Sequence, residues 1–380
     1  MDAASTPVTP RRVALHLWCL ATLASTFVLL CSGGLVTSKG VGMSVPDWPT
    51  TYGYNMFFFP FSSWVGGIFH EHLHRLIASG IGLMTMILTV STLAVEPRRW
   101  VKNLAVIAFV AVCIQGLLGG LRVSLFKNEI GIFHGMLAQS FFCLLGILTV
   151  STSPSFLRAK WDIFLPHPFL KKIALLATAL IFLQLALGAS MRHAHLGLSI
   201  PDFPLAYGKI LPDTSATTIG KINEARLADS QMPTTPTQIW LQMAHRTMAF
   251  IILGVVITVA GIVFSNPIAR SASTWSAIWL GMIFCQVALG AWTVWSNKAA
   301  DVATAHMALG ALSLLVGVLF TFRLFRASDS NRFTVPDDVR TSDLARVACS
   351  PPPLQQICKR PASLTMSWSS SKHASRFWSS

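Results

Sequence analysis

Apolar runs of membrane-spanning length recur along this chain and leave few folds open to it. A helix needs about 20 predominantly apolar residues to cross the hydrocarbon core of a bilayer. Such runs predict eight transmembrane helices, at 13–37, 70–95, 103–125, 130–151, 169–191, 238–264, 274–296 and 301–325. Only 12% of the 380 residues are charged, against about 25% in soluble domains. We therefore predict an all-α integral membrane protein surrounded by a lipid bilayer.

The distribution of Lys and Arg predicts how the chain is oriented in the membrane. Basic residues gather before the first run and in alternate connections, at Arg11, Arg12, Arg98, Arg99, Lys102, Arg158, Lys160, Lys171, Lys172, Arg270, Arg323 and Arg326. Cytoplasmic loops carry the excess of Lys and Arg, so we predict a plasma or inner membrane protein with both termini in the cytoplasm. The net charge of +14 then suits a membrane surface and does not indicate nucleic acid as a partner.

The segments outside the runs lead to further expectations. Residues 1–12 are predicted to form a cytoplasmic N-terminus, and the first run is long enough to be a retained span instead of a cleaved signal peptide. The tail, 327–380, is rich in Ser, Pro and basic residues without periodicity, which predicts cytoplasmic disorder. The connection at 192–237 is polar beyond residue 211, and we expect it to be flexible.

The chain repeats itself, which divides it into two halves. "SVPDWPTTYG" at 44–53 matches "SIPDFPLAYG" at 199–208, and "HLHR" ending at Arg75 matches "MAHR" ending at Arg246. The repeat predicts two four-helix bundles, 13–155 and 156–326, related by a pseudo-twofold axis along the membrane normal. Proline restricts its own φ and the residue before it, so "PDWP" and "PDFP" predict rigid turns that cap the bundles.

Histidines occupy matched positions in the two halves. His74 and His134 lie near the starts of the second and fourth spans, and His245 and His306 lie at the equivalent places in the second half. A single histidine at a span end is more often a polar interfacial residue, but titratable groups repeated inside a membrane indicate function. Imidazole is a good iron ligand, so we predict two bis-histidine haem sites. Glycines near them would admit a flat macrocycle: Gly119, Gly120, Gly131, Gly135, Gly281, Gly290 and Gly310.

The remaining histidines have no partner in the other half. His70, His72, His193 and His195 are each more simply explained as structural residues, and their roles stay open. The "HAH" at 193–195 supplies only two ligands and is a weak indication of a metal site.

Three residue types accompany the predicted ligands. Arg75 and Arg246 each follow one, where a guanidinium can bind a haem propionate or simply reach towards lipid headgroups; we weigh the two equally. Glu71 lies three residues before its histidine, and Gln242 takes its place in the second half. This spacing puts both on the ligand's face of the helix. The difference suggests that the first half performs chemistry while the second transfers electrons.

In these motifs the chain resembles the haem A synthase family. The resemblance rests on "EHLHR" at 71–75, "QMAHR" at 242–246, "HGMLAQ" at 134–139, the "PDWP" loop and the eight spans, and covers roughly residues 15–325. It implies oxidation of the C8 methyl of haem O to a formyl group, which gives haem A for cytochrome oxidase. It also implies that Glu71 is the essential carboxylate, that His74 and His134 flank haem O as substrate, and that His245 and His306 hold a permanent haem b.

The resemblance is incomplete and leaves several matters open. Many bacterial members carry a cysteine pair in the outer loops, whereas this chain has no cysteine in 38–69 or 192–237, so we expect no disulfide there. The electron donor, the oxidant, a homo-oligomer and delivery by a haem O synthase are not settled by the sequence. The alternative function is a di-haem b-type cytochrome passing electrons from quinol to a partner. A repeat-built transporter would show broken helices at the midplane, and none is evident.

Overall fold

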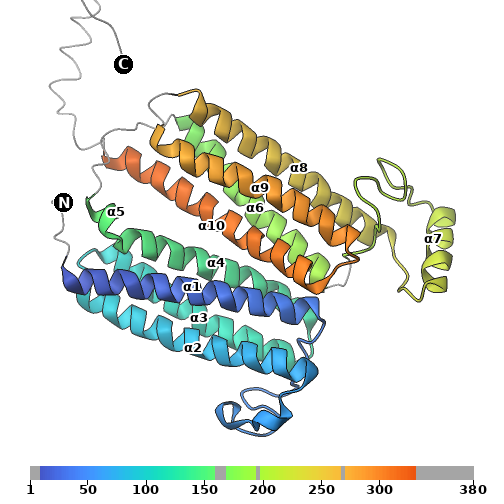
Figure 1. Cartoon of the computed structure of the whole chain (residues 1–380), viewed down its shortest axis with the longest axis horizontal. Helices are drawn as coiled ribbons and strands as arrows, with labels where there is room; N and C mark the ends of the chain where they lie inside the picture. Colours follow the sequence, from blue (N-terminus) through green and yellow to red (C-terminus); the bar gives the residue numbers. More distant parts are fainter. Residues whose placement is uncertain (1–8, 159–167, 194–196, 267–269, 331–380) are drawn as a thin grey trace, which may run out of the picture. The chain divides into compact units, whose positions relative to one another are not determined.

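Eight long helices dominate the computed structural model, which describes residues 9–158, 168–193, 197–266 and 270–330 (Figure 1). They are α1 (Pro10–Ser38), α2 (Gly66–Val95), α3 (Arg99–Ser124), α4 (Asn128–Thr152), α6 (Pro168–His193), α8 (Pro236–Phe264), α9 (Arg270–Trp295) and α10 (Ala300–Ser330). Each is long and apolar enough to cross a membrane, and no strand forms within these described ranges. The predicted all-α, multi-pass architecture is confirmed, with each helix within a few residues of its predicted bounds.

The remaining elements are short. Two 3₁₀ turns, Met56–Phe58 and Phe61–Ser63, lie between α1 and α2, and α5 spans Pro154–Arg158. The predicted boundary between the halves, 155/156, therefore falls inside α5. The predicted disordered tail lies outside the described residues except for its first residues, 327–330, which belong to the end of α10.

A helix that the sequence did not predict forms in the connection between α6 and α8. The expected flexible segment contains α7 (Ala216–Ala228), whose first turn is capped because the Ser215 hydroxyl accepts a hydrogen bond from the Thr218 N–H. At its other end, the Arg226 guanidinium donates to the carbonyls of Met232 and Leu198. These contacts fix the return of the chain towards α8, and Ile219 of α7 packs against a small apolar cluster that includes Ile200 and Ile239.

Pairwise packing groups the eight helices into two sets. Helices α1, α2, α3 and α4 contact one another in sequence order, and α4 closes back on α1. Helices α6, α8, α9 and α10 do the same, and the two sets meet through contacts among α1, α4, α6 and α10 (Figure 1). More than half of the central window of α10, 56%, is buried, against 17% for α9. Among the joining helices, α10 and α4 are thus the most enclosed, while the pseudo-twofold relation itself stays a prediction.

Apolar side chains fill both sets and also coat the outside. Leu88, Ala105 and Leu145 are fully buried among α1–α4, and Val256 and Trp279 are fully buried among α6–α10. Many large apolar side chains instead point outwards, including Val90, Ile107, Val110, Ile257 and Phe284. A lipid environment accepts such a surface, whereas water would not.

The helix ends opposite the histidines are joined by charges. Glu96, just after α2, lies 2.6 Å from the Arg98 Nε and 3.9 Å from the Arg12 Nη2. Arg98 also donates to the carbonyl of Ser151 near the end of α4. Burial by itself would raise the pKa of Glu96, but hydrogen bonds from Arg98 and the nearby charges lower it below its usual range. The carboxylate therefore stays ionised and ties together α1, α4 and the α2–α3 turn.

Candidate functional site

The two proline-containing loops adopt the same hydrogen-bonded turn. The Asp47 carboxylate accepts from the backbone N–H groups of Tyr52 and Gly53, and the Asp202 carboxylate accepts from the N–H groups of Tyr207 and Gly208. Each tyrosine hydroxyl donates to the carbonyl of the serine that opens its motif, Ser44 or Ser199. The aspartates are thus turn-forming residues, in agreement with the turns predicted for both loops.

Glu71 anchors the first of these loops to α2. Its Oε2 accepts from the Val45 N–H at 2.9 Å, and its Oε1 accepts from the Arg75 Nη2 at 2.9 Å. Arg75 in turn donates to the carbonyls of Val45, Asp47 and Thr50. The guanidinium is therefore bound chiefly to the loop backbone, an arrangement that the sequence analysis did not consider for Arg75.

Gln242 and Arg246 hold the second loop in the same way. The Gln242 Oε1 accepts from the Ile200 N–H at 2.8 Å, and its Nε2 donates to the carbonyls of Gly197 and Ile200. Arg246 donates to the carbonyls of Ile200, Asp202 and Leu205. Both amide donors of Gln242 are used by these contacts, and its oxygen accepts one hydrogen bond. The carboxylate of Glu71 accepts one hydrogen bond at each of two oxygens, donates none, and has about four lone-pair directions.

Each predicted ligand lies against a glycine of the preceding long helix. A Cβ atom built on the glycine would lie 2.9 Å from the imidazole Cε1 at Gly33–His74, 3.2 Å at Gly119–His134, 3.3 Å at Gly188–His245 and 3.2 Å at Gly290–His306. Real Cβ atoms essentially never approach as closely as at Gly33, and the other three distances are tighter than nine in ten real Cβ contacts, so glycine makes room for each ring. The buried Nδ1 of all four rings has no hydrogen-bond partner. The protein therefore positions these imidazoles sterically and leaves their nitrogens uncommitted.

Three of the four histidines share a further contact that the sequence analysis missed. Side-chain amides of Gln115, Gln184 and Gln286 donate at 2.8 Å to the backbone carbonyls of His134, His245 and His306 respectively. In each case the glutamine lies four residues before the glycine that contacts the ring. At His74 the equivalent position is Leu29. A Gln-x-x-x-Gly pattern on alternate spans was the signal that could have revealed this arrangement.

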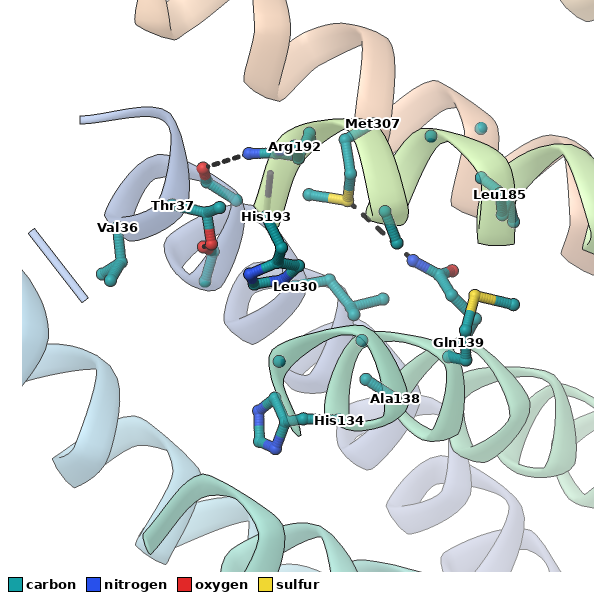
Figure 2. Close-up of a pocket in the computed structure, with 18 of the residues that line it drawn as sticks. Leu30, Val36, Thr37, His134, Ala138, Gln139, Leu185, Arg192, His193 and Met307 are labelled. Atoms are coloured by element: carbon teal, nitrogen blue, oxygen red, sulfur yellow. Dashed lines mark hydrogen bonds between the residues drawn. The ribbon is translucent and has the colours of Figure 1, made fainter. Parts of the chain in front are cut away.

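All four histidines line one cavity of about 1030 Å³. His74 and His134 are close enough to interact electrostatically, as are His245 and His306. Figure 2 shows the part of the cavity where α1, α4, α6 and α10 meet, with His134 on α4, and Gln139 of α4 donating to the sulfur of Met307 on α10. Glu71, Gln242, Arg75 and Arg246 line the same cavity.

The donor set fits a macrocyclic iron cofactor better than a bare ion. Among the described residues, no group of three or more His, Cys, Asp or Glu side chains is placed to hold a metal. A bare transition metal needs at least that many protein ligands. A porphyrin brings its own equatorial nitrogens and asks only for axial ligands, such as histidine. Two pairs of uncommitted imidazoles around a large, mostly apolar space meet that requirement.

The other histidines are explained in part. His72 is fully buried, and its Nδ1 lies 3.2 Å from the Thr51 hydroxyl oxygen. Its ring contacts those of Phe59 and Trp64. It helps to hold the first loop, which supports the structural interpretation. His70 is hydrogen-bonded to Lys39. His193 lies against Gly131 of α4 and lines the cavity. His195 lies outside the described residues, so the weak "HAH" indication stays untested.

The cavity also contains cations that the sequence analysis did not select. Arg122 on α3, Arg192 on α6 and Lys298 between α9 and α10 all line it. The Arg192 Nη2 donates to the carbonyl of Gly34 and the hydroxyl of Ser38, both on α1 (Figure 2). Burial, with Arg192 nearby, lowers the pKa of Lys298 below its usual range. Aligning Gly119 with Gly290 pairs Lys298 with Lys127, whereas Arg122 is paired with Thr293 and so has no basic counterpart.

Fold and site together define a multi-pass membrane protein with paired histidines around an internal cavity. Residues 61–318 match the COX15-CtaA family, described as "Cytochrome oxidase assembly protein", and the chain belongs to that family. It is 26% identical to a protein named "Heme A synthase" from Staphylococcus haemolyticus (strain JCSC1435), over 312 residues that cover 80% of this chain and 91% of the relative. A second "Heme A synthase", from Staphylococcus aureus (strain Newman), is 24% identical over 293 residues, covering 76% and 87%. The resemblance to the haem A synthase family is thus confirmed.

Proposed function

We propose that this chain is a haem A synthase that oxidises the C8 methyl group of haem O to a formyl group. The net change, methyl plus water to formyl, releases four protons and four electrons. Two successive hydroxylations of the methyl carbon give a gem-diol, which loses water to the aldehyde. Membership of the family and the names of the relatives support a role in haem A biosynthesis and cytochrome oxidase assembly.

In this proposal the two histidine pairs have different tasks. His74 and His134 flank the substrate haem O, and His245 and His306 hold a permanent haem b, which when bound supplies one-electron transfer. The matched glycine contacts and uncommitted Nδ1 atoms support both assignments. The first half, 13–155, is then the catalytic half and the second, 156–326, is the electron-transfer half.

The difference between Glu71 and Gln242 is the observation that carries this division. Both side chains anchor equivalent loops through an oxygen that accepts a backbone N–H. Only Glu71 brings a carboxylate beside the predicted substrate site. Oxidation at the methyl carbon builds positive charge and releases protons, which a fixed carboxylate can stabilise or accept. The amide of Gln242 is neutral and very weakly basic, so it can do neither well.

The first loop also borders the predicted substrate site. Trp48 of "PDWP" lines the cavity, and its indole lies so close to Gly120 of α3 that any Cβ there would overlap the ring. Arg75 and Glu71 hold this loop in place. A mostly apolar surrounding strengthens the interaction between a developing positive charge and the carboxylate.

Haem composition in living cells tests this proposal. The chain is expressed in a bacterial host that makes haem O but has no haem A synthase of its own, and extracted haems are separated by chromatography. We expect haem A, and its loss when both His245 and His306 are replaced by Ala. If haem O stays unchanged while the purified protein carries two b haems that quinol reduces, the di-haem cytochrome is the better description.

A further inference from the structure

Arg122 is a partly buried cation that forms no ion pair among the described residues. It lies in the last turn of α3 and lines the cavity beside His74 and His134. Its Nε is buried and has no hydrogen-bond partner, and it takes part in none of the ion pairs among the described residues. A buried charge left unpaired is costly. This arrangement therefore indicates an anionic group that is bound there in the working protein.

Neighbouring acidic groups do not meet this need. Glu71 is the carboxylate that interacts electrostatically with Arg122, but its ion pair is with Arg75, and no hydrogen bond or ion pair joins it to Arg122 among the described residues. Asp47 is used by the turn of its own loop. The guanidinium of Arg122 thus keeps donors that no described carboxylate takes.

The backbone around Arg122 is shaped to admit its guanidinium. A Cβ atom on Gly42, in the connection after α1, would lie 2.9 Å from both the Nη1 and the Nη2 of Arg122. Any other residue at 42 would therefore push the terminal nitrogens away from their present place. The guanidinium is held between this connection and α3, and its planar set of donors suits a carboxylate.

This feature belongs to the first half alone. Aligning Gly119 with Gly290 places Thr293 at the position of Arg122. The cavity cations of the second half, Arg192 and Lys298, come from other elements. Arg75, the alternative in the first half, donates both Nη atoms to loop carbonyls and to Glu71. Arg122 is thus the first-half cation that remains available to a ligand.

We propose that Arg122 forms a carboxylate-binding site for a propionate side chain of the tetrapyrrole held between His74 and His134. The inference rests on the proposed function for the identity of that ligand. It changes the sequence-based expectation, in which Arg75 was the candidate for this contact. Arg75 holds the loop, and Arg122 fixes the rotation of the macrocycle about the axis between the two imidazoles. That rotation decides which edge of the ring, and hence which methyl group, faces Glu71.

Haem binding with and without free propionates tests the site. Purified full-length protein, with its second-half haem in place, is titrated with haem B or with haem B dimethyl ester, and the Soret difference spectrum is recorded. Only uptake that is lost in His74→Ala is counted. Wild-type protein should prefer the free acid about tenfold or more, the range of a charge-assisted hydrogen bond. Arg122→Gln should bind both forms with the affinity of the ester, and Arg122→Lys should fall between.

A matched variant controls for loss of charge and for folding. Lys127→Gln removes an exposed cation near the same end of the helices and outside the cavity, and should keep the wild-type preference. Unchanged second-half haem in Arg122→Gln shows that the fold is intact. Equal affinity of wild-type protein for acid and ester, or an unchanged preference in Arg122→Gln, overturns the inference. This experiment measures binding and not catalysis. Absence of haem A in cells would therefore reject the proposed reaction but would leave the propionate-binding site supported.

Discussion

At the scale of single residues, Glu71 combines a structural and a chemical task that a conservative substitution can separate. Glu71→Gln should keep the hydrogen bond to the Val45 N–H, because Gln242 makes the equivalent bond to Ile200. The variant should therefore fold and retain the second-half haem b. Without the carboxylate, we expect haem A formation to fall at least about 100-fold, the usual scale of acid–base assistance. Haem O or a hydroxylated intermediate should accumulate in chromatography of cell extracts.

The reciprocal substitution controls for this interpretation. Gln242→Glu brings a charge to the half in which no bond-making is proposed, and it loses the amide donations to Gly197 and Ile200. We expect haem A to persist, with a lowered reduction potential of haem b because a negative charge near the iron favours the oxidised state. Normal haem A in Glu71→Gln together with lost product in Gln242→Glu would place the chemistry in the second half.

At the scale of helices, the contacts between glycine and imidazole decide how neighbouring spans approach. Gly290→Ala would place a Cβ 3.2 Å from the Cε1 of His306, which forces the ring or α9 to move. We expect shifted low-spin signals in electron paramagnetic resonance and weaker retention of haem b.

Gly281→Ala on the same helix is the control, since a Cβ there meets nothing within 4 Å. Both changes replace glycine by a better helix former, with a gain of about 0.8–1.0 kcal/mol in a helix interior. A difference between the two variants therefore reports the contact with the ring. Identical haem spectra in both variants would show that His306 does not depend on Gly290.

These helix contacts also show where sequence reasoning ends. Apolar length predicted the eight spans, and the repeat brought His74, His134, His245 and His306 together as candidates. Neither signal says how a helix is rotated against its neighbour, so neither revealed which glycine receives which ring. For the same reason the sequence did not indicate Arg122, whose importance follows from its place in the cavity beside His74 and His134. Helix α7 was missed because it has little apolar periodicity; its serine cap and its arginine contacts help to define it instead.

At the scale of the whole molecule, four helices connect the two histidine pairs. Arg192 of α6 is hydrogen-bonded to α1, and Gln139 of α4 is hydrogen-bonded to the sulfur of Met307 on α10 (Figure 2). The methyl group of Met307 also lies so close to Gly34 of α1 that a Cβ atom on this glycine would overlap it. The two pairs therefore share one cavity and one set of packing contacts. Such continuity suits the proposed division of work, in which electrons released at the first pair pass to the second.

The placement of the histidine pairs towards one face of the membrane leads to a test of topology. Every long helix has its histidine or its partnering glycine towards the end where the "PDWP" and "PDFP" loops lie, whereas Arg98, Arg99, Lys171 and Lys172 lie towards the other end. Because cytoplasmic loops carry the excess of basic residues, the histidine end should face away from the cytoplasm.

Ser62 and Ser155 are exposed on opposite ends of the molecule, and each can be changed to cysteine as a reporter in a background without native cysteines. An impermeant maleimide applied to intact cells should label Ser62→Cys and should reach Ser155→Cys only after the membrane is permeabilised. Labelling of Ser155→Cys alone would invert the orientation and place the haem chemistry at the cytoplasmic face.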